Sequence, residues 1–210
     1  MNNQRKLVLG ASAAIALVAG MMTVSFVHAT KHSSAILPME ATGPTTKTIS
    51  QHVEVKGLAG GLLQPANAQL VNEVMKATVH ANGDKTVAIP TDKPIMFFAY
   101  WCSHCHDAIS QLEQLGYADK VNFVSTQMQL KPTADEFNQG QQLTSQSFTK
   151  LGIKEPTNMY YSLPSDPFNS VLTNQPVPFL LVHTKQGWYT FSGAPSDQNV
   201  WKTVLQYAAY

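Results

Sequence analysis

The chain has 210 residues, of which 44% are hydrophobic, and this is enough for one domain with a core of its own. Only 13% of the residues are charged, and the formal net charge is +1. A surface with so little charge lacks the basic patch that binds a phosphate backbone, which excludes a nucleic-acid-binding protein. Partners are therefore expected to meet polar and apolar surface and not to be steered by charge.

Residues 1–29 have the composition of a targeting segment. Arg5 and Lys6 precede an uncharged run, Leu7 to Val27, and Val27-His28-Ala29 has the modest or small residues of a cleavage site. About 20 uncharged residues are also enough to span a bilayer. We therefore expect either a cleaved secretory signal or an N-terminal membrane anchor, and an extracytoplasmic location in both cases. Residues 30–50, rich in Thr, Ser and Pro, are expected to form a linker.

The first half of the domain, which we expect at residues 51–210, alternates between strand and helix patterns. The predicted elements are a strand at Gln51–Lys56, a helix at Ala66–His80 opened by Pro65, a strand at Thr86–Ile89 beside a turn at Asn82-Gly83-Asp84, a strand at Ile95–Tyr100, a helix at Ser103–Leu115 and a strand at Lys120–Gln127. The run Ile95–Tyr100 is apolar throughout, which predicts a strand buried on both faces. Gly116 lies where the predicted helix at Ser103–Leu115 is expected to end.

The second half predicts a helix at Thr133–Leu151 and, at the end, two strands and a helix. The strands are Pro178–His183 and Gly187–Phe191, and the helix is Asp197–Tyr210. Lys154–Asn174 is too long for a structureless loop, so two or more helices are expected there. The order predicts an α/β fold, with a mixed sheet flanked by helices and a helical insert at about 131–174, between the third strand and Pro178.

A pair of cysteines lies where the buried strand gives way to a helix, in Trp101-Cys102-Ser103-His104-Cys105. Two Cys three residues apart at a helix start can close a short disulfide, with Cys102 at the exposed tip and Cys105 towards the core. The helix N-terminus favours a thiolate at Cys102, and a protonated His104 acts in the same direction. A structural disulfide would close almost no loop and stabilise little. The pair is therefore interpreted as redox-active.

Metal binding is the alternative for the same cysteines. Cys102, Cys105, His104, His106 and His183 could in principle gather around zinc or copper. However, no second Cys-x-x-Cys motif and no paired His motif completes a four-ligand set. The sequence therefore predicts neither a metal site nor a cofactor, and a non-catalytic metal-binding module remains an alternative.

Two segments of the chain resemble the thioredoxin superfamily of thiol–disulfide oxidoreductases, both its exported DsbA-like and disulfide-isomerase-like members and its membrane-anchored thioredoxin-like members. They read FFAYWCSHC and NQPVPFLLVHTKQGWYTFSGA. The resemblance implies a thioredoxin fold in which Pro178 is a cis proline beside the disulfide and Val177 presents its backbone to the substrate. It also implies that Trp101, Ser103 and His104 tune the cysteine pair or contact the substrate. His104, at the second position between the two cysteines, resembles the His of the oxidising members of the family.

One position departs from the family pattern. Many relatives have a buried Asp or Glu six residues before the first Cys, which accepts the proton of the second Cys, and here that residue is Met96. Deprotonation of Cys105 must then rely on water, Lys93 or another group. This weakens the case for a fast reductase and leaves an oxidant less affected.

The leading hypothesis is an extracytoplasmic oxidoreductase that forms or exchanges disulfides in exported proteins. With no third Cys in the chain, a separate membrane redox partner must restore the pair. The alternative within the same chemistry is a membrane-anchored disulfide reductase, for example in cytochrome c maturation. The partners expected are exported proteins with thiols or disulfides, with membrane contact through the N-terminal segment.

Overall fold

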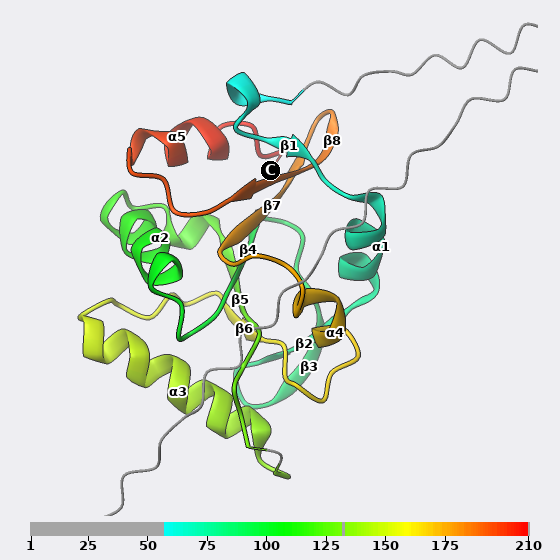
Figure 1. The fold of residues 1–210 in the computed structure, drawn as a ribbon, viewed down its shortest axis with the longest axis vertical. Helices are drawn as coiled ribbons and strands as arrows, with labels where there is room; N and C mark the ends of the chain where they lie inside the picture. Colours follow the sequence, from blue (N-terminus) through cyan, green and yellow to red (C-terminus); the bar gives the residue numbers. More distant parts are fainter. Residues whose placement is uncertain (1–56, 132, 210) are drawn as a thin grey trace, which may run out of the picture. The chain divides into compact units, whose positions relative to one another are not determined.

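The structure, a computed structural model, describes residues 57–131 and 133–209. This part of the chain forms one mixed sheet with the strand order β1-β8-β7-β4-β5-β6-β2-β3 (Figure 1). Its strands are β1 (Gln64–Pro65), β2 (Thr78–Ala81), β3 (Lys85–Ala88), β4 (Ile95–Phe98), β5 (Asn122–Ser125), β6 (Met159–Tyr161), β7 (Phe179–Thr184) and β8 (Gly187–Ser192). The helices are α1 (Ala68–Lys76), α2 (Ser103–Gln114), α3 (Glu136–Leu151), α4 (Asn169–Leu172) and α5 (Asn199–Leu205), with short 3-10 turns at Ala59–Gly61 and Ala118–Lys120.

The predicted targeting segment, the linker and the strand at Gln51–Lys56 lie outside the described residues. Within them, no helix has the length and apolar character needed to cross a membrane.

Strand β4 contributes to both halves of the hydrophobic core. Its four residues are fully buried, and alternate side chains of a strand point to opposite faces. Met96 and Phe98 pack in the cluster beneath α2, α3 and α5, whereas Ile95 and Phe97 pack in the cluster beneath α1 and α4 (Figure 1). On its two edges β4 pairs parallel with β5 and antiparallel with β7. The prediction of a doubly buried strand in an α/β sheet is confirmed.

The elements nearest the cysteine pair also agree with the sequence. Helix α2 starts at Ser103 and ends where Gly116 takes a φ of 71°, a left-handed conformation that glycine adopts without strain. Strands β7 and β8 form the predicted hairpin, closed at Thr184 by a hydroxyl that donates to the Gly187 carbonyl at 2.9 Å. Helix α5 follows and buries Trp201, whose indole N–H donates to Gln111 of α2 at 2.7 Å.

The predicted helix at Ala66–His80 is wrong at both ends. Pro65 belongs to β1, and the helix starts at Ala68 because Asn67 caps it, accepting from two backbone N–H groups. The helix stops at Lys76, and after Ala77 the residues Thr78–Ala81 form β2, which pairs with β3 across the Asn82–Asp84 turn. The helical spacing of Val79 was accidental: this residue is fully buried from a strand.

The prediction of two or more helices at Lys154–Asn174 is also wrong. This segment contains one strand, β6, and one short helix, α4. β6 pairs parallel with β5, which lets Met159 and Tyr161 enter the core on one face of the sheet. The helical insert expected before Pro178 therefore consists mainly of α3, which begins at Glu136 and not at Thr133, with α4 as its only other helix among the described residues.

The β2–β3 hairpin is attached to the rest of the sheet through His80. β2 meets β6 at the pair His80–Tyr161, and the imidazole of His80 lies between two carboxylates. Its Nδ1 is 2.7 Å from Asp84 and its Nε2 3.2 Å from Asp166. Burial alone would lower the pKa of His80, but the hydrogen bonds and charges of the two Asp residues outweigh it and raise the pKa above 6.5.

This arrangement predicts a pH dependence of stability. A pKa raised by folding means that the native protein binds the proton more tightly, so the stabilisation is full below about pH 6.5 and is lost as the pH rises through the raised value. The free energy of unfolding is measured in urea at several pH values. The wild type should lose about 1 kcal/mol or less as the pH rises, as expected for a partly exposed ion pair, and His80→Gln should not show this loss. The control is His183→Gln, in an exposed His that packs on Trp188. A wild-type slope equal to that of His80→Gln would contradict the prediction.

Candidate functional site

The two cysteines lie at the C-terminal end of β4. The chain turns after Phe98, with the Cys102 N–H donating to the Ala99 carbonyl at 3.0 Å, and Cys102 then caps α2 in an extended conformation. Cys105 lies in the first turn of the helix and faces inwards. Both cysteines are free thiols. The register of β4 therefore determines where the pair lies.

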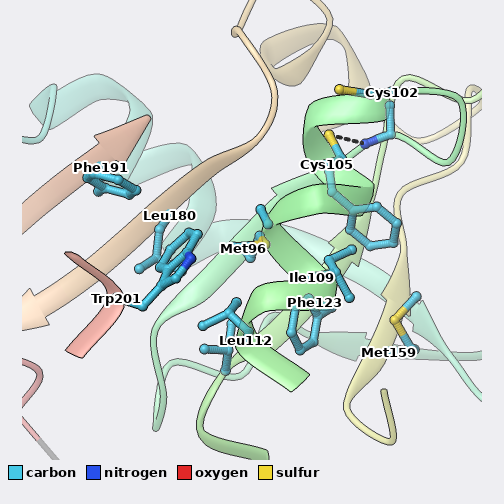
Figure 2. Packing of buried hydrophobic residues seen from close by; sticks show 14 of the residues in the cluster. Met96, Cys102, Cys105, Ile109, Leu112, Phe123, Met159, Leu180, Phe191 and Trp201 are labelled. Carbon is cyan, nitrogen blue, oxygen red and sulfur yellow. Dashed lines mark hydrogen bonds between the residues drawn. The ribbon is translucent and has the colours of Figure 1, made fainter. Parts of the chain in front are cut away.

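Cys105 is fully buried and is held as a thiol. Its sulfur accepts from the backbone N–H of Ala99 at 3.5 Å, and Met96 belongs to the same buried cluster (Figure 2). Burial raises the pKa of Cys105 most, and the hydrogen bond and charge of Cys102 raise it further, while the Ala99 N–H lowers it. Within the described residues no carboxylate contributes to this shift. At neutral pH Cys105 therefore keeps its proton.

Cys102 is less exposed than the sequence predicted. We expected it at an exposed tip, but only 9% of the residue is accessible. The reason is the segment before β7, since the Cys102 thiol donates to the Val177 carbonyl at 3.7 Å. The exposed residue is instead Trp101, at 46%.

The Val177–Pro178 peptide bond is cis, as the resemblance implied. Pro178 is buried, and its carbonyl accepts from the Gly193 N–H at 2.8 Å, which ties the segment to the end of β8. The cis proline thus immediately precedes β7, the antiparallel neighbour of β4, and its partner Val177 faces the first cysteine across the helix start. The strand order β8-β7-β4-β5, with the Cys pair at the start of α2, completes the pattern.

This is a thioredoxin fold. The assignment rests on the strand order and on the contact between Val177 and Cys102. No family model and no curated protein matches the chain.

Several solved structures are similar to it. A thiol:disulfide interchange protein DsbE from Chlorobium tepidum is 13% identical, covering 62% of this chain and 91% of its own, with a TM-score of 0.42. A secreted Mycobacterium tuberculosis disulfide oxidoreductase homologous to E. coli DsbE is 18% identical, covering 64% and 98%, with a TM-score of 0.44. A thio-disulfide isomerase from Thermus thermophilus is 14% identical, covering 70% and 97%, with a TM-score of 0.41.

The other predicted site residues surround the pair unevenly. Ser103 and His104 are exposed on the first turn of α2, and His104 borders a shallow groove between α2 and the segment from Ala194 to Gln198. Trp101 donates its indole N–H to the Gln127 carbonyl at 2.9 Å. These positions allow His104 and Trp101 to meet an incoming chain.

Two further residues near the thioredoxin-fold site have roles that the sequence did not indicate. The first is His106, which the sequence offered only as a candidate metal ligand. Its Nε2 must carry a proton because it is 2.7 Å from the Tyr100 carbonyl, which only accepts. The same nitrogen is 3.0 Å from the Ser147 hydroxyl of α3, so His106 joins the Trp101 turn to α3. The second is Gln127, two residues after the end of β5. Neither residue belongs to a recognisable motif, so no signal in the sequence pointed to these roles.

The metal alternative and the proposed role of Lys93 find no geometry to support them. His183 lies at the opposite end of β7 from Pro178 and packs on Trp188, with ring centroids 4.7 Å apart. Within residues 57–131 and 133–209, no three His, Cys, Asp or Glu side chains are grouped to hold a metal ion. Lys93 precedes β4 while Cys105 follows it, so the strand separates them and Lys93 cannot take the Cys105 proton directly.

The site predicts that Cys102 reacts first. With a limiting alkylating agent at pH 7, mass spectrometry should find the label on Cys102, because the raised pKa of Cys105 keeps that residue a buried thiol. Cys105→Ser should keep a fast-reacting thiol and Cys102→Ser should lose it, with at least a tenfold difference in rate, roughly the change expected for one pKa unit. Preferential labelling of Cys105 in the folded protein would invert the assignment.

Proposed function

We propose that this protein is an extracytoplasmic thiol–disulfide oxidoreductase that oxidises the thiols of exported proteins through Cys102 and Cys105. The observation that carries the proposal is the asymmetry of the pair. Cys102 caps α2 and faces the Val177 carbonyl, whereas Cys105 is fully buried and keeps its proton. One thiol can therefore meet a substrate, and the other can close a disulfide behind it.

The reaction starts from the Cys102–Cys105 disulfide. A substrate thiolate attacks Cys102 Sγ, the Sγ–Sγ bond breaks, and Cys105 leaves and takes up a proton. A second thiolate of the substrate then attacks the substrate sulfur of this mixed disulfide and releases Cys102 as a thiolate. The substrate gains one disulfide, and two electrons are left on the reduced pair. A quinone-linked membrane partner is the class of oxidant that would remove them.

Met96 favours this direction. In the reverse reaction Cys105 must attack a mixed disulfide, and for this it must first lose its proton. Met96 is fully buried in the cluster that contains Cys105, and its thioether cannot accept that proton as a carboxylate would (Figure 2). In the oxidising direction Cys105 is only the leaving group, so it needs no base.

The direction can be tested by the reduction potential. A stabilised Cys102 thiolate makes the reduced pair more stable and raises the potential. We expect a value nearer the about −120 mV of DsbA or −180 mV of disulfide isomerase than the about −270 mV of thioredoxin. His104→Pro should lower it by about 30 mV, which for a two-electron couple is a tenfold change in the equilibrium constant. The potential is measured by equilibration of both proteins in glutathione buffers. The histidine control is His183→Gln, because a proline at His183 would disrupt β7.

Two outcomes would contradict the proposal. A wild-type potential at or below that of thioredoxin, unchanged by His104→Pro, would favour a disulfide reductase, for example one that serves cytochrome c maturation. Tight binding of zinc or copper at Cys102 and Cys105, with no disulfide exchange, would favour the metal-binding module.

The location outside the cytoplasm rests on residues 1–29, with Arg5 and Lys6 before an uncharged run. Protease added to intact cells, with any outer envelope opened, should digest residues 30–210. A cytoplasmic protein in the same cells serves as the control for lysis. Full protection of the domain until the cells are lysed would remove the case for export.

A further inference from the structure

Gln127 has a backbone conformation that needs an explanation. It lies two residues after the end of β5 and has a φ of 51°, in the left-handed region that residues other than Gly, Asn and Asp seldom occupy. Such a conformation costs free energy, and it persists only where the surrounding contacts determine it. The contacts of Gln127 therefore show what this conformation serves.

The side chain of Gln127 donates both of its amide hydrogens to the segment before the cis proline. Nε2 is 2.9 Å from the Leu172 carbonyl at the end of α4 and 2.7 Å from the Gln175 carbonyl. The Leu172 carbonyl also accepts the Gln175 N–H at 3.0 Å, so the Gln127 amide reinforces the turn that follows α4. One side chain thus joins the end of β5 to the chain that leads to Val177.

That segment has few other means of holding its position. Pro176 and Pro178 have no N–H, so Val177 is the only backbone donor between Gln175 and Phe179. Apart from the Gln175 N–H, which donates to the Leu172 carbonyl of α4 at 3.0 Å, the hydrogen bonds that the described residues make to 175–178 come from Gln127, from the Gly193 N–H and from the Cys102 thiol. The Cys102 thiol is a reacting group and the Gln175 N–H reaches only the preceding α4, which leaves Gln127 and Gly193 as the ties to the sheet.

The main chain of Gln127 faces the other side of the site. Its carbonyl accepts the indole N–H of Trp101 at 2.9 Å, and Trp101 directly precedes Cys102. The left-handed conformation lets the same residue direct its carbonyl to Trp101 and its side chain to Gln175. Gln127 is thereby bonded to both segments that flank the Cys102 thiol.

We propose that Gln127 is a positioning residue that sets the spacing between the Trp101–Cys102 turn and the Val177–Pro178 segment, and so determines how a substrate chain lies on Cys102. This inference rests on the proposed function, since it concerns the substrate of the same reaction. It assigns Gln127 no contact with the reacting atoms. The expected consequence is a selective effect on polypeptide substrates.

Two substitutions separate the amide from the backbone. Gln127→Glu keeps the shape of the side chain but replaces the NH₂ group that donates both hydrogen bonds with a carboxylate oxygen. This oxygen repels the carbonyls of Leu172 and Gln175. Gln127→Asn keeps an amide and suits the left-handed backbone, but it is one methylene too short to reach both carbonyls. The matched control is Gln141→Glu, because the Gln141 amide also donates at 2.7 Å, to Asn82, and lies on α3.

The measurement compares a dithiol peptide with a small reagent. For each variant, kcat/KM is measured with the peptide and the oxidised protein, and the alkylation rate of Cys102 by iodoacetamide with the reduced protein. Both Gln127 variants should lower kcat/KM for the peptide about tenfold, as expected for the loss of one or two hydrogen bonds. Their alkylation rates should stay within about twofold of the wild type, and Gln141→Glu should match the wild type in both assays.

Hydrogen exchange of the Gln175 amide, which donates to the Leu172 carbonyl at 3.0 Å, gives a readout that does not need activity. Exchange should be faster in both Gln127 variants than in the wild type and Gln141→Glu. Unchanged exchange together with unchanged kcat/KM would overturn the proposal, as would an equal loss of alkylation and peptide turnover, which would mean general damage to the site. A wild-type protein that does not oxidise the peptide would refute the proposed function instead, and hydrogen exchange alone would then decide whether Gln127 holds the segment.

Discussion

The burial of β4 on both of its faces constrains everything around the cysteine pair. Met96 and Phe98 belong to one cluster and Ile95 and Phe97 to the other, so a shift of one residue along the strand would exchange the two sets. The start of α2, five residues after Phe98, is therefore held in register with the sheet. β7 lies on the other edge of the same strand, and its register brings the cis proline to the same end.

The parts of the fold that could be predicted are those whose signals are local. The apolar run predicted β4, and Gly116, which has a left-handed φ in the structure, predicted the end of α2. A short polar turn predicted the β7–β8 hairpin. The errors fell where a short apolar pattern fits two structures. Val79 has helical spacing from Met75, yet it is buried from β2. Met159 and Tyr161 have the alternation of a strand within a segment that length alone suggested was helical.

The candidate site divides in the same way. Cys102, Cys105 and Pro178 were predicted because their spacing and context are visible within short stretches of sequence. Gln127 was not, because its partners, Leu172 and Gln175, are more than 40 residues away along the chain, at separations of 45 and 48. The partner of a polar side chain depends on the topology, and the topology here includes α4, which the sequence placed only within a broad region.

The buried position of Cys105 has a consequence for the lifetime of the covalent complex. The second cysteine can attack the mixed disulfide and return the substrate unchanged. With its pKa raised by burial and with Met96 in place of a carboxylate in the same buried cluster, Cys105 is slow to make that attack at neutral pH. Under the proposed function, a substrate with a single thiol would then remain bound, and a substrate would leave only once its own second thiol had reached the first. Commitment to the product would thus depend on the geometry of the client protein and not on that of the enzyme.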